Sequence, residues 1–198
     1  MREAPVRRII VDLGAGFTFD NIIRLIQEPF LKEKLKDPDT ILILSGGYTN
    51  PAFPYMSEAE YKLKLLVADG LPPEKIFTED RSIRTTQNLK FSFKLITRLG
   101  IKVEEIIITG EEGSKKEALW LAPRYARRYL GYAPKKIEYF GIPYLDSNRR
   151  KKKEALFLLI VAAYYFPPLD IALTWYRMLS IRLRSFKLRR EIRRIKRR

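Results

Sequence analysis

The sequence predicts an α/β domain built on a Rossmann-like, doubly wound and mainly parallel sheet with helices on both faces, followed by a basic helical C-terminal tail. Short apolar runs alternate with helical segments of about a dozen residues, the order typical of parallel sheets with right-handed crossovers. The runs are continuously apolar, which is typical of strands covered on both faces. Basic residues concentrate after residue 148. We therefore expect an α/β domain at 1–148 and a C-terminal extension at 149–198.

Five apolar runs are expected to be strands, and four segments between them are expected to be helices. The strands are 7–13, 40–44, 75–78, 103–108 and 136–140, and the helices are 19–35 with a bend at Pro29, 57–68, 89–99 and 118–130. Ser57 is expected to cap its helix, with Glu60 completing a capping box and Gly70 ending it. Thr85 or Thr86 is expected to cap the helix that begins near Gln87.

Ligands of such sheets bind beyond the carboxyl ends of the strands. The polar and small residues expected to gather there are Asp12, Gly14, Gly16, Ser45, Gly46, Gly47, Ser82, Thr85, Asn88 and Thr109. Gly46 and Gly47 allow a tight turn whose N–H groups would point outward and suit an anionic ligand. A dinucleotide fingerprint would need glycine where Phe19 stands, so a nicotinamide or flavin site is not expected.

The order of Ser45-Gly46-Gly47, Ser57-Glu58-Ala59 and Glu79-x-x-Ser82-x-x-Thr85-x-x-Asn88 resembles a family of domains of unknown function that includes YdcF, SanA and ElyC. The resemblance covers roughly residues 7–145. It implies a pocket for a nucleotide-like or otherwise anionic small molecule, with S-adenosylmethionine as one candidate, and a role in an envelope-related process. In this interpretation the loops at 45–47 and 82–88 bind the ligand, while Glu58 and Glu79 orient them or meet a cation. The first-turn position of Glu58 is equally explained by the helix dipole.

The chain has no histidine and no cysteine, so any catalysis would use carboxylates, lysine, tyrosine, hydroxyl groups or an oxygen-ligated metal. Members of the family usually carry a histidine near Gly113 and an arginine near Lys116, and neither is present here. The resemblance therefore implies no particular reaction. An alternative is a Mg²⁺-dependent enzyme acting on phosphorylated or lipid-linked precursors through Asp12, Glu58 or Glu79.

The extension carries most of the charge. The net charge is +16, and residues 149–198 hold 16 basic and 3 acidic residues, or +13. An apolar run at 155–166 is shorter than the about 20 residues of a membrane span, so a buried or interfacial helix is expected. A basic amphipathic helix follows, and its expected membrane-binding residues are Trp175, Tyr176, Arg182, Arg184, Lys187, Arg189 and Arg190.

This composition predicts binding to an anionic membrane surface, and thus a place at the cytoplasmic face of the membrane, because no signal peptide is recognised at the start of the sequence. Two alternatives remain open, namely binding of the tail to RNA or DNA and a partly disordered solubilising tail. The four asparagines and two glutamines are few for this length, a bias typical of thermophiles.

Overall fold

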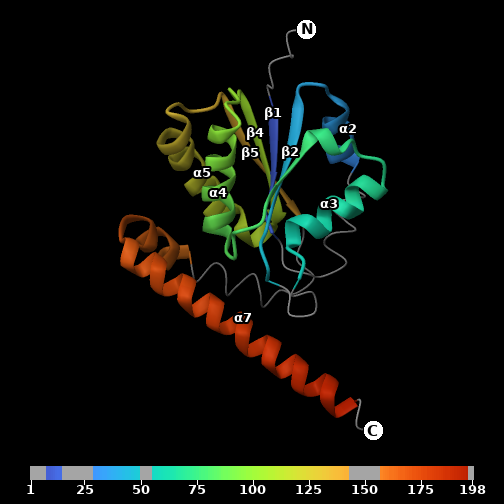
Figure 1. Ribbon diagram of the computed structural model, residues 1–198. Helices are drawn as coiled ribbons and strands as arrows, with labels where there is room; N and C mark the ends of the chain where they lie inside the picture. Colours follow the sequence, from blue (N-terminus) through green and yellow to red (C-terminus); the bar gives the residue numbers. More distant parts are fainter. Residues whose placement is uncertain (1–7, 15–28, 50–54, 143–156, 196–198) are drawn as a thin grey trace.

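Five parallel strands form the centre of the molecule in a computed structural model that describes residues 8–14, 29–49, 55–142 and 157–195. The strands are β1 (Arg8–Asp12), β2 (Thr40–Ser45), β3 (Ile76–Glu79), β4 (Glu105–Glu111) and β5 (Lys136–Ile142). Their order in the sheet is β3-β2-β1-β4-β5, and every neighbouring pair is parallel (Figure 1). The prediction of a Rossmann-like parallel sheet is confirmed.

Helices cover both faces of the sheet. Helices α4 (Thr85–Arg98) and α5 (Lys115–Tyr125) lie on one face, and α2 (Pro29–Lys36) and α3 (Glu58–Ala68) lie on the other (Figure 1). Each face of the sheet has its own hydrophobic core, and alternate residues of a strand pack into one or the other because successive side chains point to opposite faces. Ile9 and Val11 pack with Phe93 of α4, whereas Ile10 packs with Leu66 of α3.

Short elements connect these layers. They are the 3₁₀ turns η1 (Pro73–Lys75) and η2 (Glu112–Ser114) and the π-helical turn η3 (Ala126–Leu130), which continues α5. The capping box of α3 is present, since Glu60 N donates to Ser57 Oγ (3.0 Å) and Ser57 N donates to Glu60 Oε2 (2.9 Å). The prediction that Ser57 and Glu60 start this helix is therefore confirmed.

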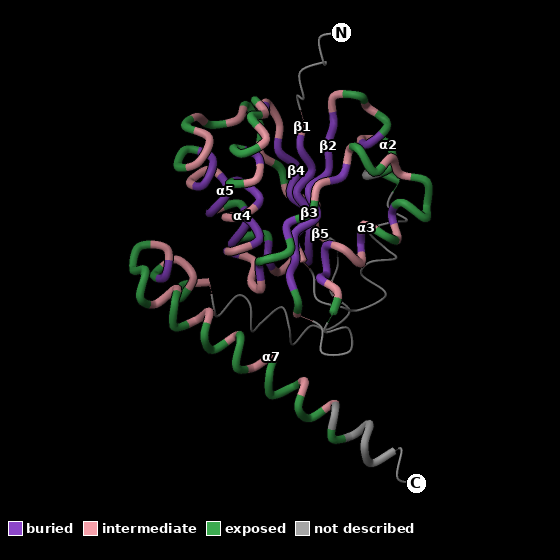
Figure 2. Tube along the Cα trace, viewed as in Figure 1, coloured by how far each residue is buried: buried purple, intermediate pink, exposed green. Residues whose placement is uncertain are grey.

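The C-terminal extension is helical at 157–165 and in α7 (Pro167–Ile195). The first segment packs on the domain, because Ala163 is buried and Ile160 and Tyr164 lie against the core beneath α4 and α5. Trp120 of α5 contacts Tyr164 edge-on, with ring centroids 5.3 Å apart. Helix α7 then runs past the end of the sheet at which β2 and β3 finish, with most of its surface exposed (Figure 2).

Neither α7 nor any other helix in the described ranges combines the length and apolar character that a bilayer span requires.

Candidate functional site

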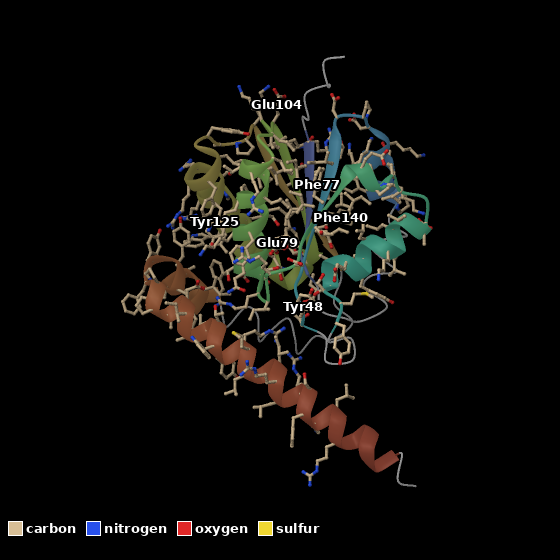
Figure 3. The ribbon with its side chains drawn as sticks, in the orientation of Figure 1. Tyr48, Phe77, Glu79, Glu104, Tyr125 and Phe140 are labelled. Atoms are coloured by element: carbon tan, nitrogen blue, oxygen red, sulfur yellow. The ribbon has the colours of Figure 1, made fainter. Side chains whose placement is uncertain are left out.

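Polar side chains meet where the strands end, as the sequence predicts. Asp12 ends β1 and is paired in register with Thr109 of β4, and Ser45 ends β2 opposite Glu79, the last residue of β3. All four are at most 7% exposed. In Figure 3 the labelled Glu79 and Tyr48 lie at this end of the molecule, and Glu104 lies at the opposite end. Because β1 and β4 are neighbours that lead into helices on opposite faces, this end contains the topological switch point of the sheet.

One hydrogen-bond network centres on the Glu79 carboxylate. Its Oε2 accepts from Ser45 Oγ at 2.6 Å, and its Oε1 accepts from the backbone N–H groups of Arg81 (2.8 Å) and Ser82 (3.1 Å). Ser82 Oγ lies 3.2 Å from Ser45 Oγ. This carboxylate therefore fixes the loop after β3 against the end of β2.

Asn88 extends this network to β1. In the amide orientation that satisfies both of its ends, Oδ1 accepts from Gly14 N (2.8 Å), and Nδ2 donates to Ser82 Oγ (2.5 Å) and Arg84 O (3.1 Å). Asn88 is 3% exposed. Gly14 has no room for a side chain, because a Cβ there would lie 2.9 Å from Glu58 Oε2. The network thus holds the loops after three strands in one arrangement.

The prediction that the N–H groups of Gly46 and Gly47 point outward is wrong. Gly46 N donates to Glu79 O (2.9 Å) and Gly47 N donates to Ser82 O (2.6 Å), so the two donors pair with the last residue of β3 and with the loop that follows it. A Cβ on Gly47 would lie 2.6 Å from the carbonyl oxygens of Asp80 and Ser82. Gly47 therefore allows a close approach of two backbones, and the paired N–H groups of the two glycines do not form an anion cradle.

The prediction that Thr85 or Thr86 caps α4 is also wrong. The helix begins at Thr85, earlier than expected, and its N-cap residue is Arg84, which makes no capping hydrogen bond through its side chain. Gln87 Oε1 instead accepts from Ile83 N at 3.1 Å. The earlier start turns Thr86 inward, where its Oγ1 has no hydrogen-bond partner among the described residues.

The most unusual group at this end is a buried lysine. Lys62 of α3 is 2% exposed, and its ammonium forms an ion pair with Asp12. The same Nζ lies 3.6 Å from Glu58 Oε1, and the other oxygen of Asp12, Oδ1, accepts from Thr109 Oγ1 at 2.8 Å. We call Asp12, Glu58 and Lys62 the buried charge triad.

Two carboxylates facing one ammonium explain the electrostatics of the triad. Burial raises the pKa of Asp12, against the opposing attraction of Lys62 and the hydrogen bonds from Lys62 and Thr109. Burial alone would lower the pKa of Lys62, but the charges of Asp12 and Glu58 outweigh it, so that pKa is raised. Burial is therefore the dominant effect at Asp12, whereas at Lys62 the attraction of two carboxylates outweighs burial. The triad has a net charge of −1 when all three groups are ionised.

Sequence reasoning missed Lys62. The available signal is its position, three residues after the buried Ala59 and four before the buried Leu66, which places a lysine on the apolar stripe of α3. Its spacing of four residues from Glu58 also allows the ion pair within the helix.

Several expected residues lie elsewhere or outside the described residues. Thr85 is partly exposed at the start of α4, and Gly16 lies outside the described ranges. Within those ranges no group of three or more acidic residues is arranged to hold a metal ion. Gly113 lies in η2 and Lys116 in the first turn of α5, so both follow β4 at the same end of the sheet.

The expected membrane residues all lie on α7. Trp175 and Tyr176 are 65% and 74% exposed, and Arg182, Arg184, Lys187 and Arg190 are exposed as well. Arg189 belongs to the same helix, but its side chain is outside the description.

Helix α7 is held to the domain by its first turns. Arg84 Nη1 donates to Asp170 O (3.0 Å) and to Thr174 Oγ1 (3.1 Å), and it lies 3.1 Å from Asp170 Oδ1. Gln87 Nε2 donates to Thr174 Oγ1 (3.1 Å), and Arg177 Nε donates to Ile83 O (3.4 Å). We call these contacts the α7 junction. They attach the tail to the segment that connects β3 with α4.

Comparison of the chain with models of known protein families and with characterised proteins found no match.

Proposed function

We propose that this chain is a peripheral membrane protein of the YdcF-like type, which lies on an anionic lipid surface through α7 and binds a small polar molecule at the switch point of its sheet. The observation that carries the first half is a row of exposed apolar side chains on α7. Each of its members is more than half exposed, and they are Ile171, Trp175, Tyr176, Leu179, Leu183 and Phe186. We call them the apolar row.

The apolar row is not needed to hold α7 to the domain. The α7 junction uses Asp170, Thr174 and Arg177, which lie on the other side of the helix at 3.6 residues per turn. Large exposed apolar patches on soluble domains commonly mark binding surfaces. The apolar row therefore has an exposed face of its own, available to a bilayer.

Basic residues beside the apolar row favour an anionic bilayer as its partner. Arg182, Lys187 and Arg190 are exposed along the same helix. Each basic residue near an anionic surface contributes about 1 kcal/mol, and the six apolar side chains gain further from leaving water. A nucleic acid would use the charges alone, because its phosphate backbone offers nothing to Leu179 or Phe186.

Flotation with lipid vesicles tests this half. Wild-type protein is expected to float with vesicles of phosphatidylglycerol and to stay behind with vesicles of phosphatidylcholine. The double variant Leu179→Glu/Phe186→Glu is expected to lose flotation. Val67→Glu/Leu119→Glu, which makes the same change at two partly exposed apolar residues of α3 and α5, is the matched control and should float. Equal flotation of both double variants would refute the role of α7, and binding that RNA abolishes at matched salt would favour the nucleic-acid alternative.

The proposed binding of a small polar molecule is supported by the buried charge triad at the switch point. Burying ions is costly, and a charge pair can often be replaced by apolar residues without loss of stability. Fully buried ions at the end of the sheet where ligands bind are therefore typical of a functional site. Among the described residues, the triad and Glu79 hold three carboxylates and one ammonium, a balance that disfavours a purely anionic ligand.

S-adenosylmethionine suits this charge better than a polyphosphate, because it carries a sulfonium and an ammonium group beside one carboxylate. Titration calorimetry of the full chain with S-adenosylmethionine and with ATP tests the choice. We expect heat of binding with the former and none with the latter. Binding of ATP alone would overturn the charge argument, and binding of neither would remove S-adenosylmethionine as the ligand.

A further inference from the structure

We infer that α7 and the ligand-side loop, by which we mean residues 79–88 from the end of β3 to the first turn of α4, form one coupled unit, so that attachment of α7 to a membrane stabilises the ligand-side loop. The inference rests on the proposed membrane attachment. Its structural basis is the α7 junction, which joins the tail to the same short segment that carries Glu79, Ser82 and Asn88.

Arg84 belongs to both sides of this unit. Its carbonyl oxygen accepts from Asn88 N at 2.8 Å and from the Asn88 amide at 3.1 Å, which ties it to the network of Ser82 and Gly14. Its guanidinium reaches Asp170 and Thr174 of α7, and the Arg84 side chain is only 12% exposed. A movement of α7 would therefore displace the backbone at Arg84, to which the Asn88 side chain is hydrogen-bonded.

Thr174 is the centre of the junction on the α7 side. Its single hydroxyl group accepts from both Arg84 Nη1 and Gln87 Nε2 and donates to Asp170 O at 2.8 Å. The side-chain oxygen of Gln87 accepts a hydrogen bond from Ile83 N, and the carbonyl oxygen of Ile83 accepts one from Arg177 Nε. The hydrogen bonds of the loop and of the tail thus form one continuous set.

The sign of the coupling follows from the geometry of the helix. Asp170, Thr174 and Arg177 contact the domain, whereas the apolar row lies on the exposed side of the helix, so α7 can contact a bilayer and the loop at the same time. Binding to a surface favours the helical state of α7 that also makes the junction. Membrane attachment is therefore expected to slow opening of the loop, and ligand binding that requires the ordered loop should become tighter on vesicles.

Hydrogen exchange of the full chain tests the inference. In solution, Thr174→Val keeps the shape of the side chain but removes both accepted hydrogen bonds, and we expect exchange of amides at 83–88 to become about tenfold faster. Ser185→Ala is the matched control, because Ser185 Oγ makes the same bond to the carbonyl four residues earlier (Ile181 O, 3.0 Å) on a part of α7 beyond the α7 junction. Thr174→Ser should restore slow exchange. Exchange at 83–88 that is the same in Thr174→Val and wild type would overturn the coupling.

A second comparison uses vesicles of phosphatidylglycerol. Exchange at 83–88 is expected to become at least threefold slower when wild-type protein binds, and to remain unchanged for Leu179→Glu/Phe186→Glu. Binding without this slowing would refute the coupling and leave the attachment standing. Failure of wild-type protein to bind would refute the attachment, and the membrane-linked part of the inference with it.

Discussion

Replacing Lys62 by methionine should destabilise the folded protein strongly. Methionine has nearly the same length but no charge, so Asp12 would remain buried at 1% exposure without the ammonium that pairs with it. Among the described side chains, Thr109 Oγ1 is the donor to Asp12 that would remain. Removing one partner of a buried ion pair costs about 3–5 kcal/mol. That is a large part of the about 5–15 kcal/mol by which domains are usually stable.

Urea unfolding followed by circular dichroism measures the loss. Lys64→Met is the matched control, since Lys64 is an exposed lysine of the same helix, and it should stay within about 0.5 kcal/mol of wild type. The double variant Asp12→Asn/Lys62→Met should recover part of the loss, because it no longer buries an uncompensated Asp12 carboxylate. A loss below about 1 kcal/mol for Lys62→Met, or strict additivity in the double variant, would refute this explanation of the triad.

Three further predictions concern the same end of the sheet. Glu79→Gln places an amide donor near Ser45 Oγ and two backbone N–H groups, and we expect a loss of about 2 kcal/mol in urea unfolding; an unchanged midpoint would contradict the network. Gly47→Ala should lower the free energy of unfolding by about 2 kcal/mol or more, because its Cβ would meet two backbone carbonyls at 2.6 Å, whereas an unchanged value would show that the loop can yield. The pKa of Lys62 is raised in the folded protein, so the charged ammonium stabilises the fold fully below its ordinary pKa of 10.5. This stabilisation is lost as the pH rises through the pKa of the folded state. The difference in unfolding free energy between wild type and Lys62→Met should therefore shrink only above pH 10.5.

Most of the fold follows from local patterns. The strand at 40–44 is a continuous apolar run between turn residues, and the Ser57 to Glu60 spacing encodes a capping box that needs no tertiary contact. The meeting of Asp12, Ser45, Glu79 and Thr109 follows from topology alone, because the carboxyl ends of neighbouring parallel strands share one end of the sheet.

The parts that were missed depend on contacts between distant segments. The N–H groups of Gly46 and Gly47 donate to the carbonyls of Glu79 and Ser82, more than thirty residues away along the chain, so no local sequence pattern indicates that these donors are already paired. The burial of Lys62 depends on Asp12, fifty residues earlier. The packing of 157–165 on α5 depends on an aromatic contact with Trp120, which the apolar run alone does not specify.

The two tryptophans of the chain allow a direct measurement of whether the apolar row of α7 enters the surface of a bilayer. Trp175 lies in the row, and Trp120 of α5 packs against the helix at 157–165. In Trp120→Phe, the fluorescence of Trp175 should shift to shorter wavelength and be quenched by brominated phosphatidylglycerol. In Trp175→Phe, the remaining Trp120 should respond far less. Vesicle binding that leaves Trp175 unshifted and unquenched would contradict the account, since the charges alone would then hold the protein to the lipid.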